Sequence, residues 1–245
     1  MIVTFFILLG GMGYLPSVPN IHTLDDPPAV INVAPDTIRL PEKLYTEATV
    51  SSQYIFNGAR YHVYDRTAPT HQFYQTRDMM VGTLRYDGRN YGPYEMHYDI
   101  NFNQLIVKHP TGGYLVTLVT ERIEEFNLNG KRFKKIVGHP QLPDAIYEFF
   151  YEGPTQILCH RKKNRIEKTE DRTTIPFYLD ASAYYLKVGE DYKRIRRKKD
   201  LYLLFPDKKR ELRSHFRRLQ IPFNPNKDRF ILDAALILDN QRPTQ

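Results

Sequence analysis

Short aromatic and apolar runs alternate with turn dipeptides along the chain from about residue 52 onward. Asn57-Gly58, Asp87-Gly88 and Asn129-Gly130 are pairs that a two-residue type I′ turn requires, because both central positions of that turn have a positive φ. Glu152-Gly153 and Gly189-Glu190 are weaker versions of the same signal. The pattern therefore predicts successive β-hairpins joined in an antiparallel meander.

The apolar runs predict the strands of this sheet. Residues 104–108 and 114–119 are nearly continuously apolar, which is typical of strands buried on both faces. Other runs alternate, which predicts one face in contact with water. The 18 Tyr and 14 Phe residues also favour strands. The predicted strands cover residues 54–56, 61–64, 81–86, 95–98, 104–108, 114–119, 122–128, 132–137, 145–151, 155–162, 177–179, 183–187 and 192–196, with Pro93 as a break before 95–98.

The hydrophobic period changes near the C-terminus, where residues 207–221 carry Leu212, Phe216 and Leu219 at the spacing of one helical face. Asp207 is the expected N-cap of this helix.

Residues 227–238 predict a second helix, which begins after Asn224 or Asn226 and ends at Asn240. Residues 201–205 are interpreted as a short helical turn. The predicted fold is mainly β, an antiparallel hairpin or meander sheet that is open or partly closed, with two short C-terminal α-helices.

The first 51 residues have a different composition from the rest. Residues 2–15 form an apolar run that is shorter than the roughly 20 residues of a transmembrane helix and fits the h-region of a secretory signal. A misplaced start codon or a buried first strand are the alternatives. Six of the 17 prolines follow, which favours an extended arm. We therefore divide the chain into a signal peptide (1–15), a Pro-rich arm or linker (16–51), an antiparallel β domain (52–199) and a basic helical segment (200–245).

The formal net charge of +7 is concentrated in one segment. Between Lys187 and Arg218 there are 13 Lys or Arg against 5 Asp or Glu, whereas the remainder of the chain is close to neutral. Clustered cations of this kind can bind phosphate, anionic lipid or an acidic protein, and the alternative is a solvated helix face. The candidate contacts for an anionic partner are Arg194, Arg196, Arg197, Lys198, Lys208, Lys209, Arg213, Arg217 and Arg218.

Other chemistry has weaker support. His97 and Asp99 stand at i and i+2 on one strand face and form a candidate polar site, although we expect both side chains to face water. The chain carries no HExxH, CxxC, GxSxG, Walker A or GxGxxG motif. The single Cys159 rules out an intrachain disulfide and a Cys-rich zinc site. We predict no catalytic residues, no metal and no cofactor, and the chain is not expected to be an enzyme.

Four stretches carry a resemblance: YHVYDR at 61–66 with HQFY at 71–74, YDG…YD…LIV within 86–107, ERIEEFNLNGKRF at 121–133, and the ending from LYLLFPDKKRELR at 201–213 to residue 238. Together they resemble a family of exported proteins of Bacteroidota. The resemblance implies export and a mainly β fold, and it brings no catalytic residues or cofactor.

The function expected from these observations is that of a non-catalytic accessory subunit or interaction module in a larger envelope assembly. Its place would be the periplasm or the periplasmic face of the outer membrane, without a transmembrane span. The expected partners are an outer-membrane protein complex and an anionic lipid or glycan, whereas export would remove a nucleic-acid target. A lipid- or glycan-binding carrier is the alternative, and a hydrolase is a third class.

Overall fold

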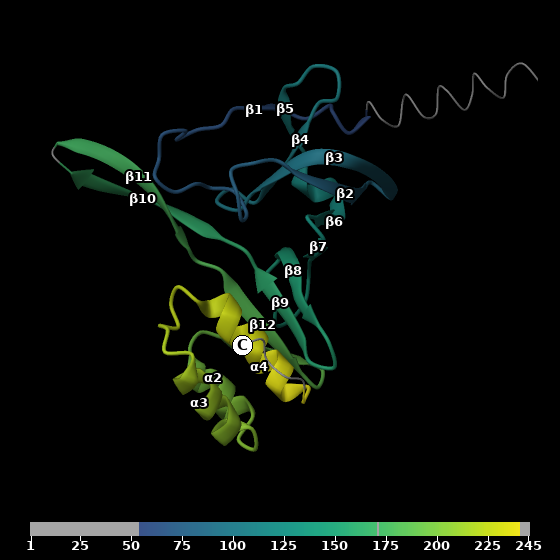
Figure 1. Ribbon diagram of the computed structural model, residues 1–245. Helices are drawn as coiled ribbons and strands as arrows, with labels where there is room; N and C mark the ends of the chain where they lie inside the picture. The colour runs from purple at the N-terminus through teal and green to yellow at the C-terminus, as the bar shows by residue number, and fades with distance from the viewer. Residues whose placement is uncertain (1–53, 171, 241–245) are drawn as a thin grey trace, which may run out of the picture. The chain divides into compact units, whose positions relative to one another are not determined.

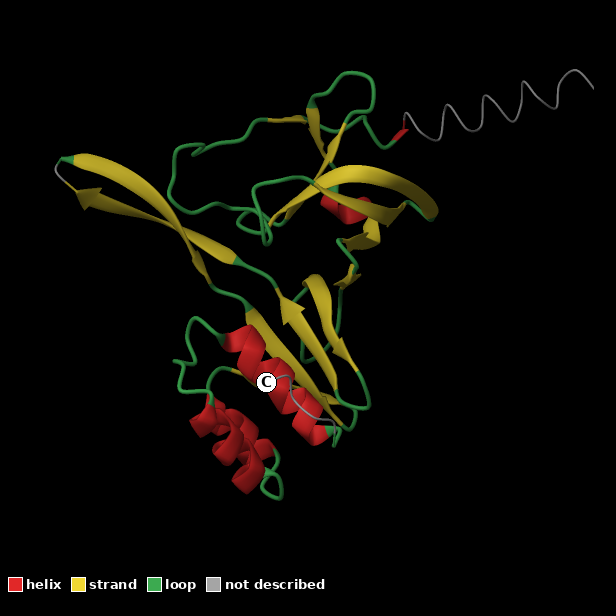
Figure 2. Ribbon diagram, in the orientation of Figure 1, coloured by secondary structure: helices red, strands yellow, loops and turns green. Residues whose placement is uncertain are grey.

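The computed structural model describes residues 54–170 and 172–240, all of which belong to one structural unit. The predicted signal peptide and Pro-rich arm lie outside the described residues. The fold is mainly β, as predicted: eleven antiparallel strands form one open sheet, a further hairpin projects from it, and helices follow at the C-terminus (Figures 1 and 2).

The order of strands in the large sheet is β1-β5-β4-β3-β2-β6-β7-β8-β9-β12-β13. Most neighbours in the sheet are also neighbours in sequence, because short turns join them into a meander. The large sheet contains β1 (Arg60–Tyr61), β2 (Met80–Tyr86), β3 (Arg89–Asp99), β4 (Gln104–Lys108), β5 (Leu115–Thr117), β6 (Ile123–Leu128), β7 (Lys131–Ile136), β8 (Ala145–Glu152), β9 (Gln156–His160), β12 (Ala183–Val188) and β13 (Asp191–Ile195); β10 (Lys163–Glu170) and β11 (Thr173–Asp180) form the separate hairpin, and a 3-10 turn spans Thr120–Arg122.

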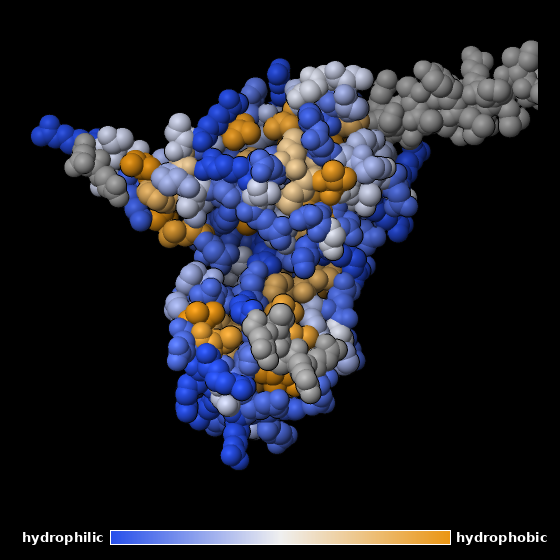
Figure 3. Space-filling model, in the orientation of Figure 1, coloured by the Kyte–Doolittle hydropathy of each residue, from blue (hydrophilic) through white to orange (hydrophobic). Residues whose placement is uncertain are grey.

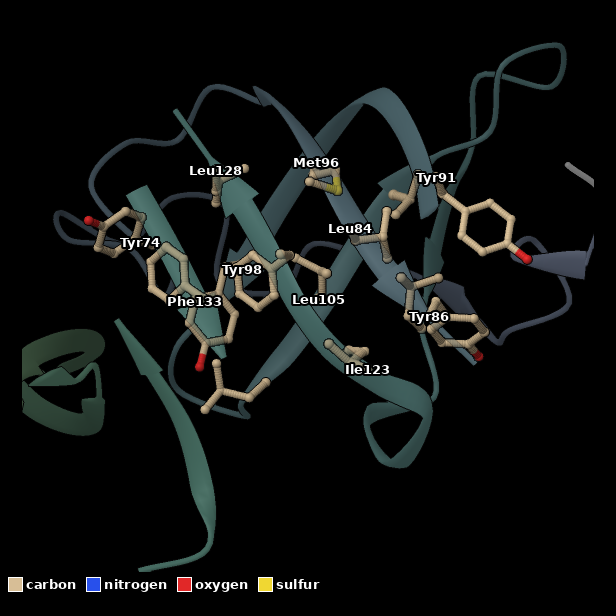
Figure 4. Packing of buried hydrophobic residues seen from close by; sticks show 14 of the residues in the cluster. Tyr74, Leu84, Tyr86, Tyr91, Met96, Tyr98, Leu105, Ile123, Leu128 and Phe133 are labelled. Carbon is tan, nitrogen blue, oxygen red and sulfur yellow. The ribbon is translucent and has the colours of Figure 1, made fainter. Parts of the chain in front are cut away.

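The first core lies against strands β2 to β7 and is rich in aromatic rings (Figure 4). Tyr98 and Phe126 pack on Phe133, with ring centroids 5.5 and 4.6 Å from it. Met96 and Leu105 are fully buried beside them. Strand β2 alternates between buried and exposed positions, so one face of this strand contacts water, as the alternation predicted.

The second core lies between the C-terminal end of the sheet and three helices, α2 (Lys198–Leu204), α3 (Lys209–Arg218) and α4 (Lys227–Leu238). We expected two helices. The predicted helical turn at 201–205 is the end of α2, a helix that begins three residues earlier because the Asp200 carboxylate accepts from the backbone N–H groups of Arg196 and Arg197 at 2.8 and 3.0 Å. Lys208, not Asp207, is the N-cap of α3.

The turn predictions have mixed outcomes. Asp87-Gly88 and Asn129-Gly130 adopt a positive φ at both positions and join β2 to β3 and β6 to β7, as predicted. Gly189 also has a positive φ, in the turn between β12 and β13. Asn57-Gly58 does not join two strands, and the preceding residues 54–56 form a helical turn and not the predicted strand.

Pro93 does not break its strand, contrary to our prediction. Strand β3 continues through it, and the pairing with β2 shifts register between Gly82 and Leu84, opposite Pro93. A bulge of this kind accommodates a proline within a sheet, because the missing N–H is not needed for the ladder there. Among the described residues, no helix has the length and apolarity that a membrane span needs.

Candidate functional site

Helix α3 presents a cationic face to solvent. Leu212 and Phe216 are buried, which orients the opposite side of the helix outward. That side carries Lys209, Arg210, Arg213, Ser214, Arg217 and Arg218, all of them exposed. Five of these six side chains are cationic, and they recur at helical spacings of three and four residues, so their charges lie along one face. Figure 3 shows hydrophilic side chains over much of this region.

Aromatic rings pack against the buried side of α3 and against two cations near its exposed face. Phe216 lies with its ring centroid 5.0 Å from that of Phe230 in α4. The Lys198 ammonium lies 4.0 Å from the Phe230 ring centroid, and the Arg213 guanidinium lies 5.2 Å from that of Tyr202. Cations over aromatic faces are attracted by the ring quadrupole. Helix α3, which carries the cationic face, is therefore held against α4 by packed aromatic side chains.

A buried carboxylate also links α3 to α4. Asp233 of α4 has no solvent exposure, and its Oδ2 lies 2.8 Å from His215 Nε2 and 2.9 Å from Arg229 Nε. Because a buried carboxylate needs such donors, this contact fixes the rotation of α3 about its axis. The rotation in turn determines which side chains face outward.

The charges of the exposed face lack acidic partners in the part of the chain that the structure describes. Within the described residues, Lys208 pairs with Glu211 and Arg197 with Asp200, but no ion pair involves Lys209, Arg210, Arg213, Arg217 or Arg218. Lys209 with Arg213, and Arg213 with Arg217, stand at i and i+4, where like charges destabilise a helix by about 0.2–0.5 kcal/mol per pair. Lys209 and Arg210 also lie in the first turn, where the helix dipole disfavours cations by about 0.3–1 kcal/mol each. An anion bound at this face would relieve both effects.

Two shallow hollows mark the same surface. One of about 570 Å³ is lined by Pro206 and the six exposed side chains of α3. A second of about 290 Å³ lies on the other side of Arg213 and Arg217, where Lys198, Tyr202 and Phe216 complete its lining. This arrangement offers cations in both hollows and aromatic surface in the second, which suits an acidic partner better than an apolar ligand.

The structure separates the nine predicted cationic contacts. Lys209, Arg213, Arg217 and Arg218 share the exposed face of α3, and Lys198 lies beside it. Lys208 is engaged with Glu211 and Asn240, at 3.3 and 2.7 Å. Arg196 and Arg197 precede α2. Arg194 pairs with Tyr185 in the β12–β13 ladder and lies on the face of the sheet away from the helices. Arg210, Ser214 and Tyr202 belong to the α3 surface but were not predicted, although the i, i+4 spacing could have indicated the first two.

His97 and Asp99 are buried, so our expectation that they face water is wrong. Asp99 has no solvent exposure and accepts from the Tyr61 and Tyr64 hydroxyls at 2.8 Å each. It also accepts from the backbone N–H groups of Asn101 and Phe102 at 2.9 and 3.1 Å. Burial raises the pKa of both tyrosines above the ordinary value, and the charge of Asp99 raises both further. With its oxygens occupied, this carboxylate organises the loop after β3.

The imidazole of His97 stacks on Phe73 at 4.1 Å, and its Nδ1 has no hydrogen-bond partner among residues 54–170 and 172–240. Burial lowers the pKa of His97 to about 4. No group of three or more His, Cys, Asp or Glu side chains among the described residues could hold a metal ion. His97 and Asp99 thus belong to the packing of β3.

A buried ionic network near the second core was not predicted. Arg161 is 10% exposed at its side chain and contacts Glu148, which is 1% exposed. It also contacts the Asp228 carboxylate of α4 at 3.0 Å and the Tyr184 hydroxyl at 3.2 Å. Tyr74, from the segment before β2, donates to Glu148 at 3.2 Å. The network links this segment, β8, β12 and α4. In the sequence, the feature that could have indicated it is the charged Glu148 within the otherwise apolar run AIYEFFYE.

Comparison of the chain with protein-family models, with curated proteins and with solved structures finds no match.

Proposed function

We propose that this protein is a non-catalytic interaction module that docks onto an acidic surface of a partner protein through the exposed face of α3. The observation that carries the proposal is the set of five exposed cations on α3, none of which has a carboxylate partner among the described residues. The position of α3 against α4 is fixed by the packing of Phe216 on Phe230 and by the His215–Asp233 contact. Association with a larger assembly of the cell envelope, at the periplasmic side of the outer membrane, rests on the apolar run at 2–15 and on the resemblance described above.

The lipid-carrier alternative has less support from the geometry. The hollows near α3 are lined mainly by charged side chains, whereas a lipid site is predominantly apolar.

The test is affinity purification of the tagged full chain from the native host, with chemical cross-linking to identify the contact. A variant with Arg213→Gln, Arg217→Gln and Arg218→Gln removes three charges from α3. A matched control, with Arg89→Gln, Lys131→Gln and Lys134→Gln, removes the same charge from exposed positions on other elements.

An exposed ion pair contributes about 0.2–1 kcal/mol, so three pairs correspond to a loss of affinity of roughly 3-fold to 150-fold. The loss should shrink as salt concentration rises, because the contacts are exposed. We expect a stoichiometric partner with the wild-type and control proteins and weaker recovery with the α3 variant. Recovery of the protein without any partner, or equal recovery with both variants, would overturn the proposal.

A further inference from the structure

A separate cationic hollow lies on the face of the sheet opposite the helices. The β9–β12 register places His160 opposite Ala183, and the β12–β13 register places Arg194 opposite Tyr185. Side chains alternate along a strand, and Cys159, Tyr184 and Ile195 pack toward the helices. His160, Ala183, Tyr185 and Arg194 therefore share the other face, to which Lys162 is added at the start of the hairpin.

Small side chains create the hollow. Ala181 and Ala183 stand where larger residues would fill the space between Tyr185 and His160, and the volume left is about 380 Å³. The Tyr185 ring supplies an apolar wall and is itself held edge-on by Tyr147, at 5.7 Å between centroids. This volume lies in the range of small-molecule sites.

The charges that face this hollow are positive. Lys162, Arg194 and His160 contribute to its lining, and no acidic residue in the described ranges does. Neither Lys162 nor Arg194 forms an ion pair with any described residue. The acids on nearby segments do not line it: Asp144 accepts from the Gly138 N–H at 2.7 Å, and Asp180 accepts from the Ser182 hydroxyl at 2.5 Å. Burial lowers the pKa of His160, and the nearby charges of Lys162 and Arg194 lower it further.

We infer that this hollow binds a small phosphorylated compound whose organic part is about the size of a monosaccharide. Lys162 and Arg194 together supply two positive charges, which match the dianion of a phosphate monoester, and the Arg guanidinium can contact phosphate oxygens in a bidentate manner. The Asn164 amide at the rim can bind a hydroxyl group, and the remaining volume between Tyr185 and Ala183 accommodates a ring. This site does not depend on the proposed α3 surface, which lies on the helix side of the same strands.

The experiment compares three probes with related bodies and different charges: glucose, glucuronate and glucose 6-phosphate. Inorganic phosphate is a fourth probe that separates recognition of the phosphate from recognition of the whole molecule. Calorimetry on the full chain measures affinity, and NMR of the histidine ring protons locates binding at His160. We expect glucose 6-phosphate to bind, to raise the pKa of His160, and to bind more tightly than inorganic phosphate, with no detectable binding of glucose.

Lys162→Gln and Arg194→Gln should each weaken binding of glucose 6-phosphate at least tenfold. Both residues are exposed, so the substitutions leave the core intact. Lys193→Gln is the matched control, because Lys193 is adjacent to Arg194 on the same strand but points to the other face, where it contacts Asp191 at 3.0 Å. The α3 variant, with Arg213→Gln, Arg217→Gln and Arg218→Gln, should bind glucose 6-phosphate with the affinity of the wild-type protein.

Several results would overturn the inference. They are the absence of binding at millimolar glucose 6-phosphate, binding that survives both substitutions, and binding that is lost in the α3 variant but kept in Arg194→Gln. Equal affinity for glucuronate would refute the preference for a dianion. Equal affinity for inorganic phosphate would refute the contribution of the apolar wall.

Discussion

Replacing Arg161 by Met tests whether the buried network stabilises the fold. Met keeps the length of the apolar stem but leaves Glu148, at 1% exposure, without its cation. Among the described residues, the Tyr74 hydroxyl is then its remaining side-chain donor. Removing one partner of a buried ion pair destabilises a protein by about 3–5 kcal/mol, because the other charge stays buried. For a chain of this length, each kcal/mol lowers the Tm by roughly 2–4 °C, so the expected decrease is about 6–20 °C.

Two further variants distinguish the buried charge from lost packing. Asp228→Asn should cost under about 1 kcal/mol, because the Asp228 side chain is 53% exposed and solvent screens its contact with Arg161. Combining Arg161→Met with Glu148→Leu removes both buried charges, and the double variant should recover most of the lost stability.

The assay is urea unfolding followed by far-UV circular dichroism and by Tyr fluorescence, since the chain contains no Trp. A cost below about 1 kcal/mol for Arg161→Met would refute the reasoning, because that is the range of exposed pairs. So would a double variant that is no more stable than the single one, since the loss would then come from packing.

Two other predictions concern buried polar groups. Burial lowers the pKa of His97 and of His71 to about 4, so between the ordinary value of 6.5 and 4 the unfolded chain binds more protons than the folded one. Stability should therefore fall as the pH drops through that window, by at most about 1.4 kcal/mol per pH unit for each histidine, and should lose nothing more from these groups below it. His97→Gln should reduce the slope of the urea midpoint against pH, with the exposed His62→Gln as control; an unchanged slope would contradict the assignment. Asp233→Asn weakens the charge-assisted bonds to His215 and Arg229 and should cost about 1.5–3 kcal/mol in thermal unfolding, whereas an unaltered Tm would show that this contact does not hold α3.

Local chemistry explains which turns could be predicted from sequence. Asp87-Gly88 and Asn129-Gly130 form turns because their own residues tolerate a positive φ, a property that depends on nothing distant. Asn57-Gly58 matches the same turn pattern, but the glycine is required there for another reason. A Cβ at this position would lie 1.9 Å from the Thr117 carbonyl oxygen, so this glycine permits close approach of β5. Nothing near Asn57 in the sequence indicates that contact.

The β10–β11 hairpin was only partly predicted because distant contacts hold it. Its charged first strand lacks the alternation typical of a half-buried strand, and a two-stranded ribbon is marginal alone in water. Asp65 stabilises it from about a hundred residues away, through the Tyr178 hydroxyl and Arg165 Nε, each at 2.6 Å. Lys163 Nζ donates to the His71 and Phe73 carbonyls at 2.8 Å.

The two candidate surfaces also differ in how far the local sequence could predict them. The cations of α3 could be predicted because helical spacing places them on one face whatever the rest of the fold does. Arg194 belonged to the same run of positive charge in the sequence, yet strand alternation turns it away from α3 and toward His160. Its neighbours in the hollow come from β9 and β12, and a pairing register of this kind is not encoded in local composition.

This separation has a consequence for binding. Strands β9, β12 and β13 have the helices on one face and the cationic hollow on the other, so the sheet lies between the two surfaces. A partner protein on α3 and a small anion at Arg194 would not compete for space, and both could be bound at once. The positive charge of one continuous segment would then serve two distinct ligands, since Lys193 and Arg194 lie on opposite faces of β13. Measuring glucose 6-phosphate affinity with and without the purified partner would test this independence: mutual exclusion would mean that the two surfaces are parts of a single interface.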